Sequence, residues 1–292
     1  VTALGNTNYS LSEEESVYSW EIKKASTTNS ASKVSINGWT YGGYNGVKNT
    51  PSIDPSLNPE NQPVQYTYYT DEACTTQTST ENGAETEGGV PKNAGTYYVK
   101  AQIPESANYN AGTATGTFEI KPLPAQLDWS SSDLTYNGKD QTVTAKVTNA
   151  LSGDTFTLTY ETDETYTNTG KNARKYTAKV TALGNTNYSL SEEESVYSWE
   201  IKKASTTNSA SKVSINGWTY GGYNGVKNTP SIDPSLNPEN QPVQYTYYTD
   251  EACTTQTSTE NGAETEGGVP KNAGTYYVKA QIPESANYNA GT

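Results

Sequence analysis

Few side chains in this sequence could take part in chemistry. Its 292 residues include no histidine, 2 cysteines and 24 tyrosines. Without histidine, neither a Ser-His-Asp triad nor a Cys-His pair can be assembled, and the common His/Cys zinc sites are excluded as well. We therefore predict no catalytic residue, no cofactor and no metal ion, and we interpret the protein as one that is not an enzyme.

Clustered carboxylates are the remaining candidates for a cation site. They lie at 13–15, again at 192–194, and at Glu81, Glu85 and Glu87. None of these clusters has the Asp-x-Asp-x-Asp-Gly spacing with which a loop surrounds Ca²⁺ with oxygen ligands. We expect solvated loops at these positions.

Tyrosine rings could serve a different purpose, because an aromatic face can stack on a sugar. By strand alternation Tyr44, Tyr69 and Tyr98 are expected to point outward, where they are candidate ligand-facing residues. Pairing of tyrosines between neighbouring strands is the other interpretation. Nearby, the loop at 50–63 contains four prolines, and we expect it to be irregular since proline donates no backbone hydrogen bond.

The elements that position these residues are repeated. Val1–Thr113 recurs without a mismatch as Val180–Thr292. Self-similarity at a fixed period indicates a repeat architecture. A catalytic site gains little from being copied, whereas a stalk gains length and a binding array gains avidity. The two cysteines, Cys74 and Cys253, are one position in two copies, so each is interpreted as a packed thiol or as a thiol that pairs between chains.

Each period contains two related modules, A and B. Both contain Lys-Asn-Ala, an alternating strand, an Asn-Tyr turn and a last strand that ends in Glu-Ile-Lys. We predict the last strands of a B module at 1–23, an A module at 24–121, a B module at 122–202, and a second A module without its last strand at 203–292. On this interpretation the sequence is part of a longer array. A divergent B between identical A modules would also reduce strand exchange between neighbours.

The local pattern is β throughout. Apolar residues alternate with polar ones at Tyr97, Val99, Ala101 and Ile103, and Asn-Gly and Gly-Gly pairs separate such runs. This is typical of half-buried antiparallel strands joined by tight turns. The predicted fold class is all-β, with tandem small antiparallel β-sandwich-like modules (immunoglobulin-like or related) arranged end to end.

The joints between modules are predicted to be short. Pro122 and Pro124 stiffen the passage from A to B, because proline fixes φ and favours extended backbone. The longer, polar segment from B to the next A, at 202–212, is expected to bend more. Tyr41 and Gly42 in A, with Tyr136 and Gly138 in B, are expected to shape the loops that face a joint.

Charge and hydropathy restrict the partners. The net charge of −13 argues against a phosphate backbone, so no nucleic-acid partner is expected. No run of 18 or more apolar residues occurs, so we expect no membrane insertion within this segment.

Several of these motifs together resemble the MBG-type repeat domains of bacterial cell-surface, adhesin-like proteins. The likeness covers essentially the whole chain, and its motifs are Tyr41-Gly42, Tyr136-Asn137-Gly138, Tyr66-Thr67-Tyr68-Tyr69, Pro91-Lys92-Asn93-Ala94-Gly95-Thr96-Tyr97-Tyr98-Val99, Asn108-Tyr109-Asn110 and Gly116-Thr117-Phe118-Glu119-Ile120. Arg174 departs from the pattern, since it stands where a glycine is expected. The resemblance implies an extracellular location at the bacterial surface and no catalytic residues.

Three functions follow as hypotheses. The first is a structural, non-catalytic stalk or spacer segment of a secreted or wall-anchored surface protein. The second is an adhesive module that binds a glycan or protein of a host or neighbouring cell through the loop at 50–63 and the outward tyrosines. The third is a subunit of a self-assembling extracellular filament, joined through sheet edges or through Cys74.

Overall fold

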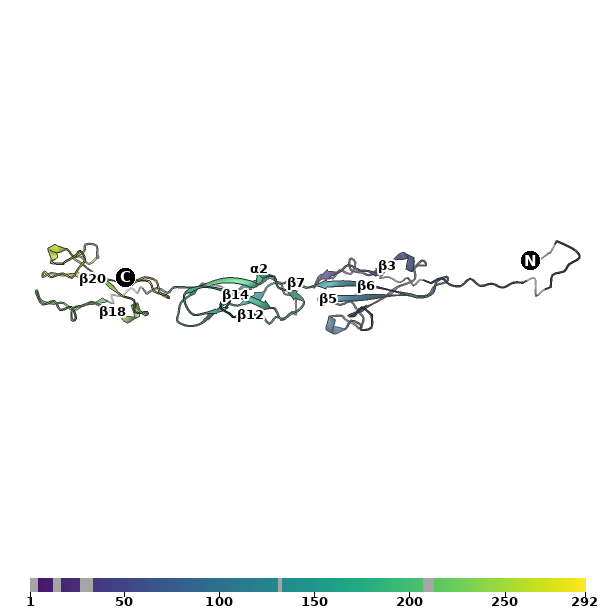
Figure 1. Cartoon of the computed structure of the whole chain (residues 1–292), viewed down its shortest axis with the longest axis horizontal. Helices are drawn as coiled ribbons and strands as arrows, with labels where there is room; N and C mark the ends of the chain where they lie inside the picture. The colour runs from purple at the N-terminus through teal and green to yellow at the C-terminus, as the bar shows by residue number, and fades with distance from the viewer. Residues whose placement is uncertain (1–4, 13–16, 27–33, 131–132, 207–212) are drawn as a thin grey trace. The chain divides into compact units, whose positions relative to one another are not determined.

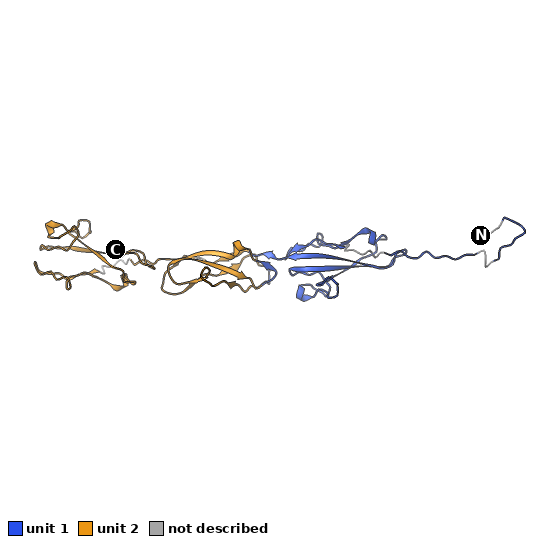
Figure 2. Ribbon diagram, in the orientation of Figure 1, with its two compact units in different colours: residues 1–125, 151–155, 185–189 blue, residues 126–150, 156–184, 190–292 orange. Residues whose placement is uncertain are grey.

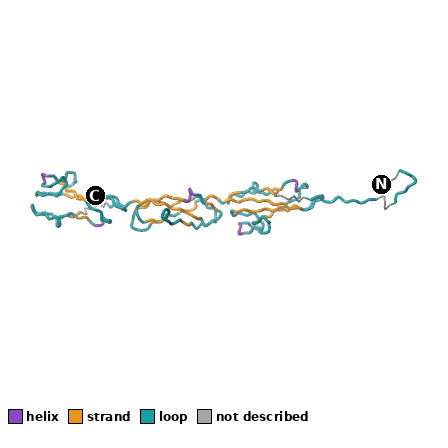
Figure 3. The backbone as a smooth tube through the Cα atoms, in the orientation of Figure 1, coloured by secondary structure: helices purple, strands orange, loops and turns teal. Residues whose placement is uncertain are grey.

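The computed structural model describes residues 5–12, 17–26, 34–130, 133–206 and 213–292 (Figure 1). Two compact units divide the chain: residues 1–125, 151–155 and 185–189 form unit 1, and residues 126–150, 156–184 and 190–292 form unit 2 (Figure 2). The predicted all-β class is confirmed, because strands and loops make up nearly the whole chain and helices are single short turns (Figure 3).

The first A module, in unit 1, is built on a four-stranded sheet. Its strands are β4 (Gln65–Tyr69), β5 (Gly95–Ile103), β6 (Gly112–Lys121) and β2 (Trp39–Thr40), in the order β2-β6-β5-β4. Alternate residues of β5 are buried as the period-2 pattern predicts.

Phe118 lies at the centre of this module's core. Its ring stacks on Trp39 at a centroid distance of 5.1 Å and contacts Tyr68 and Tyr97 at 5.9 Å each. Ile120, two residues further along β6, is fully buried. A sheet with few large aliphatic residues thus obtains its apolar area from aromatic rings.

A second, two-stranded sheet pairs β1 (Val34–Ser35) with β3 (Ser52–Ile53). The 3₁₀ helices η1 (Pro55–Leu57) and η2 (Thr80–Asn82) lie in the loops. The prediction of an irregular loop at 50–63 is therefore wrong in part. Pro55 begins a helical turn, where no N–H is needed, and Asp54 caps that turn by accepting from the N–H of Ser56 at 2.8 Å.

The B module has the same sheet order. Its strands are β12 (Thr159–Tyr160), β14 (Arg174–Ala182), β16 (Val196–Lys202) and β9 (Leu134–Thr135), in the order β12-β14-β16-β9. Tyr176 stacks on Trp199 at 4.5 Å in its core. Smaller sheets pair β8 (Leu127–Trp129) with β11 (Ala145–Val147) and β10 (Gln141–Thr142) with β13 (Thr169–Gly170), and helix α2 is Glu192–Ser195.

One pairing in the first A module and one in the B module correct the expectation of purely antiparallel strands. β2 runs parallel to β6, and β9 runs parallel to β16. A short strand near the start of each of these two modules is therefore a neighbour of the last strand and runs in the same direction. Their shared register, Trp39 opposite Ile120 and Leu134 opposite Ile201, supports the relationship between A and B.

The second A module, in unit 2, keeps most elements of the first. They are β17 (Val213–Ser214), β18 (Ser231–Ile232), η3 (Pro234–Leu236), β19 (Gln244–Tyr248), η4 (Thr259–Asn261) and β20 (Tyr277–Gln281). β19 pairs with β20 in the register of β4 and β5. The sequence ends at Thr292, which is the position equivalent to Thr113 in β6.

Candidate functional site

The segment that leaves the first A module is paired with a turn of the B sequence. β7 (Leu123–Pro124) runs parallel to β15 (Tyr188–Ser189) within unit 1. The N–H groups of Leu123 and Ala125 donate to the carbonyls of Asn187 and Ser189, both at 2.9 Å. Since these donors flank Pro124, the missing N–H of the proline removes no bond from the pairing.

The same pairing occurs at the start of both A modules. Ala204 donates to the carbonyl of Asn287 at 2.9 Å and accepts from the N–H of Asn289 at 2.8 Å. Ala25 donates to the carbonyl of Asn108 at 2.8 Å. At all three places, the backbone of the segment that precedes a module is therefore bonded to the Asn-Tyr turn of that module.

The asparagine side chain of this turn reaches the preceding module. Asn187 Oδ1 accepts from the backbone N–H of Ala94 at 2.8 Å, and its Nδ2 donates to Asn93 Oδ1 at 3.3 Å. In unit 2, Asn287 Oδ1 accepts from the backbone N–H of Ala173 at 2.7 Å. Ala94 and Ala173 both end a Lys-Asn-Ala motif, so one contact is made twice with equivalent residues.

The tyrosine of the same turn packs on a second motif of the preceding module. Tyr188 lies edge-on to Tyr41 with ring centroids 5.6 Å apart, and Tyr288 lies edge-on to Tyr136 at 5.4 Å. Such aromatic pairs contribute about 0.5–1.5 kcal/mol beyond the area that they bury. In each case, the Asn-Tyr turn of one module contacts two turns of the preceding module. One of these is a Tyr-Gly or Tyr-Asn turn, and the other contains the Lys-Asn-Ala motif. We call this set of contacts a joint contact.

Asp154 links the two tyrosines of the joint contact in unit 1. Its carboxylate accepts from the hydroxyl of Tyr41 at 2.9 Å and from the hydroxyl of Tyr188 at 2.6 Å. The hydroxyl of Tyr188 also accepts from the N–H of Leu151 at 2.8 Å. Burial and the hydrogen bond to Asp154 raise the pKa of Tyr41 to about 12, and the same two causes raise the pKa of Tyr188.

Gly42 is required beside these tyrosines for two reasons. Its φ of +77° belongs to the left-handed region, and a Cβ there would lie 2.4 Å from Leu151 Cδ1. The copy of this residue, Gly221, has a φ of +78° but no atom within 4 Å of the corresponding position.

The joint contact in unit 2 uses a different carboxylate. Glu239 accepts from Asn287 Nδ2 at 2.7 Å, and hydrogen bonds from Ser285 and Asn287 hold the pKa of Glu239 below its ordinary value. Glu60 holds Asn108 in the same way at 2.6 Å in the first copy. This bond therefore belongs to the A module itself and orients the asparagine before any contact with B.

The asparagine of the Asn-Tyr turn differs in exposure between the two A copies. Asn108 is exposed, whereas Asn287, which makes the equivalent bond to a glutamate and also accepts from the N–H of Ala173, is 7% exposed. The burial of this asparagine therefore comes from the joint contact and not from the fold of the A module.

Three tyrosines were predicted to point outward, where a ligand could reach them, and for one of them this prediction is wrong. Tyr44 is 45% exposed and stands edge-on to Trp39 at 5.1 Å, and Tyr98 is half-buried. Tyr69 is only 8% exposed, so the prediction that it points outward is wrong. The chain turns back after β4, and Gln77 forms a bridge with Tyr69 that alternation along a single strand cannot reveal.

The remaining predicted residues lie in turns or at the surface. Cys74 and Cys253 are half-buried at φ values of 53° and 54°, and burial raises the pKa of the Cys74 thiol. Pro122 is exposed next to β7. Gly138 has a φ of +76° and no atom within 4 Å of a Cβ position, so it serves the turn conformation only.

The acidic cluster at 192–194 forms the first turn of α2, where Ser191 caps the helix and Glu194 accepts from the N–H of Leu127 at 2.9 Å. The cluster at 13–15 lies outside the described residues. Where the chain is described, no group of three or more His, Cys, Asp or Glu side chains is placed to hold a metal ion. Within the same ranges, no helix has the length and apolar character to span a membrane.

Sequence reasoning missed the residues that complete the joint contacts. These are Asn187, Asn287, Tyr188, Tyr288 and Asp154. The recurrence of Asn-Tyr in every module was visible in the sequence. Recurrence alone does not show whether a turn makes contacts within its own module or with a neighbouring module. Asp154 gave no signal, because its partner Tyr41 is 113 residues away.

Neither a comparison with models of known protein families nor a comparison with curated proteins finds a match.

Proposed function

We propose that this chain is a structural, non-catalytic repeat segment, a stalk or spacer, of a secreted or wall-anchored bacterial surface protein of the adhesin-like type. Small β modules, related to sandwiches of the immunoglobulin type, would be held end to end. The number of modules would then set the reach of the protein, and no ligand would be needed for the segment to act.

The observation that carries this proposal is the joint contact, which two different module pairs make with equivalent residues. In each, the chain leaving one module is bonded to the Asn-Tyr turn of the next, and the asparagine of that turn bonds back to the first. A backbone connection reinforced by a side-chain bond restricts bending at the connection. A spacer needs this property, whereas a catalyst does not.

The exact repeat and the resemblance to MBG-type domains support the extracellular location. Each added A–B period would lengthen the segment without a new binding surface. The excess of acidic residues keeps such a chain soluble and discourages association between copies.

Small-angle X-ray scattering of the full chain tests the proposal. We expect a scattering profile of an elongated particle for the wild type and a broader distribution of dimensions for the double variant Asn187→Ala, Asn287→Ala. A compact particle for the wild type, or identical profiles for the two proteins, would contradict the spacer role.

A second candidate, glycan binding, is favoured by a hollow that both A modules contain. In the first copy the hollow has a volume of about 600 Å³ and is lined by Trp39, Tyr44, Glu85 and Lys92 among others. The ion pair between Lys92 and Glu85, at 3.1 Å, lies beside the exposed ring of Tyr44. An aromatic face next to charged hydrogen-bonding groups is a combination that suits a sugar.

A glycan array probed with the full chain distinguishes this candidate. Binding that is lost in the double variant Tyr44→Ala, Tyr223→Ala would establish it. Binding that survives both substitutions would place the site elsewhere, and no binding at millimolar ligand would leave the spacer role alone.

A further inference from the structure

The chain enters and leaves the first A module through neighbouring segments that run in the same direction. We call residues 34–41 the entry segment of this module. Trp39, on the entry segment, lies opposite Ile120 of the last strand, β6, in a parallel pairing. The N–H of Tyr41 then donates to the carbonyl of Lys121 at 2.8 Å. The two points at which the module is joined to the rest of the chain are therefore bonded directly to each other.

The B module repeats this arrangement with residues 133–136 as its entry segment. Leu134 lies opposite Ile201 of its last strand, β16, again in a parallel pairing. The N–H of Tyr136 donates to the carbonyl of Lys202 at 2.9 Å. An earlier parallel pairing, β7 with β15, already holds the entering chain at the Asn-Tyr turn. The geometry therefore belongs to both kinds of module.

Parallel neighbours respond to tension differently from strands that are pulled at adjacent ends. Tension along the chain draws the entry segment toward the N-terminus and the last strand toward the C-terminus. Because the two segments run in the same direction, they are drawn lengthwise past each other, and the hydrogen bonds between them lie across the pull. All of these bonds then carry load together, whereas strands pulled at adjacent ends separate one bond at a time.

Two glycines bring the entry segment of the first A module against β6. A Cβ at Gly38 would lie 2.3 Å from the carbonyl oxygen of Glu119, and a Cβ at Gly116 would lie 2.3 Å from the carbonyl oxygen of Val34. The atoms approached so closely belong to the backbone, which cannot swing aside as a flexible side chain can. The entry segment can therefore slide along β6 only if the two backbones first separate.

The B module connects the same two segments through a charged pair. Nζ of Lys202, at the end of β16, lies 2.9 Å from Oδ1 of Asp133, which precedes β9. Both side chains are largely exposed. An exposed ion pair is screened by salt and adds little to stability. The contact between backbones in the A module should therefore resist sliding better than the ion pair in the B module.

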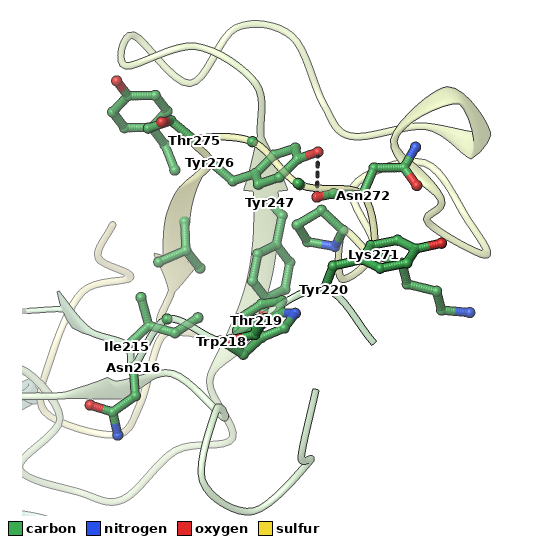
Figure 4. A pocket seen from close by; sticks show the side chains of 16 residues that line it. Ile215, Asn216, Trp218, Thr219, Tyr220, Tyr247, Lys271, Asn272, Thr275 and Tyr276 are labelled. Carbon is green, nitrogen blue, oxygen red and sulfur yellow. Dashed lines mark hydrogen bonds between the residues drawn. The ribbon is translucent and has the colours of Figure 1, made fainter. Parts of the chain in front are cut away.

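The joint contact is also tied to the sheet of the preceding module. In both A modules and in the B module, a tyrosine hydroxyl on or beside the next strand donates to the asparagine carbonyl of the Lys-Asn-Ala motif. These bonds are Tyr97 to Asn93 at 3.1 Å, Tyr176 to Asn172 at 2.8 Å and Tyr276 to Asn272 at 3.2 Å. Figure 4 shows the last of them. A pull on this turn is therefore passed to a strand.

We infer that this chain bears tension, and that the parallel pairing between the entry segment and the last strand is what resists the opening of a module. This function goes beyond the spacer role, because a spacer sets a distance whether or not anything pulls on it. The first A module should withstand more force than the B module, since backbone packs against backbone at its entry.

Optical tweezers test this inference by pulling the full chain in two directions. One chain is held at its two ends. The other is held at its C-terminal end and at the variant Val47→Cys, an exposed position after β2. Both carry Cys74→Ser and Cys253→Ser, so that only the intended thiol reacts. Held at residue 47, the chain pulls β2 and β6 at adjacent ends.

The A module should open roughly tenfold faster, or more, at a given force when the chain is held at residue 47, because its bonds then break singly. The B module is the internal control, since both arrangements load it in the same direction, and its opening rate should not change. The two events are distinguished by length, because the A module releases more chain than the B module.

Matched glycine variants, held at the two ends of the chain, locate the resistance. Gly38→Ala places a Cβ 2.3 Å from the carbonyl oxygen of Glu119, whereas Gly46→Ala places one where no described atom lies within 4 Å. Gly38→Ala should open the A module roughly tenfold faster at a given force, about the effect of one lost hydrogen bond. Gly46→Ala should leave the rate unchanged. Far-ultraviolet circular dichroism checks that both variants fold, and the comparison of pulling directions needs neither.

Equal opening rates of the A module in the two pulling directions would overturn the inference. A folded Gly38→Ala chain whose A module opens at the wild-type rate would overturn it as well. Neither result would bear on the spacer role, which small-angle scattering tests through the dimensions of the unloaded chain. A compact particle in that experiment would, in turn, leave the force measurements unaffected.

Discussion

At the scale of single residues, each joint contact depends on one asparagine. Removing Asn287 leaves the N–H of Ala173 without its acceptor, and such a loss costs about 1–3 kcal/mol when the group is shielded from water. We predict that Asn287→Ala speeds hydrogen exchange of the Ala173 amide by roughly tenfold or more, measured by mass spectrometry.

The repeat supplies the control for this experiment. Asn108→Ala removes the same side chain and the same bond to a glutamate, but Asn108 makes no bond to a preceding module where the chain is described. The Ala173 amide should exchange at the wild-type rate in Asn108→Ala. Equal acceleration in both variants would mean that Asn287 acts only within its own module.

Tyr41 makes the joint contact in unit 1 sensitive to alkali. Its pKa of about 12 in the folded protein lies above the ordinary value of 10.0, so the folded state retains the proton longer than the unfolded state. The stability that Tyr41 contributes is therefore complete below pH 10.0 and is lost as the pH rises toward about 12. We predict that Tyr41→Phe reduces the alkaline loss of stability, measured by urea unfolding at several pH values. An unchanged slope would exclude Tyr41 as its source.

At the scale of elements, the turn at Gly42 connects backbone conformation with packing. Gly42→Ala should cost about 1–2 kcal/mol for a left-handed conformation, and it also forces a Cβ against Leu151. Gly221→Ala carries the same conformational cost without that overlap. We predict that only Gly42→Ala increases exchange of the Leu151 amide, which bonds to the hydroxyl of Tyr188. Unchanged exchange of the Leu151 amide in Gly42→Ala would contradict this prediction.

Strands with a clear local period were predictable, and elements defined by distant partners were not. β5 and β14 alternate over nine residues each, so their buried faces could be identified from sequence. β2 has only two residues, which is too short for an alternating pattern to be recognised. Its partner strand lies about 80 positions away in the sequence. The same reason explains the joint contacts: the motifs were recognisable, but their pairing depends on contacts between segments far apart in sequence.

At the scale of the whole molecule, the joint contacts should decide how the chain responds to its own charge. The net charge of −13 is spread over all modules, and exposed like charges repel each other within a Debye length. That length falls from about 30 Å at 0.01 M salt to about 10 Å at 0.1 M. Modules that are free to bend should therefore approach each other as salt is added, whereas modules fixed by their joints should not.

This reasoning gives a prediction for the full chain. The radius of gyration of the wild type, measured by small-angle scattering, should change little between 0.01 M and 0.1 M salt. In Asn187→Ala, Asn287→Ala the radius should decrease over the same range, because both side-chain bonds to the preceding modules are gone. The single variant Asn108→Ala should behave as the wild type. A decrease of the same size in all three proteins would mean that repulsion between charges, and not the joint contacts, keeps the modules apart.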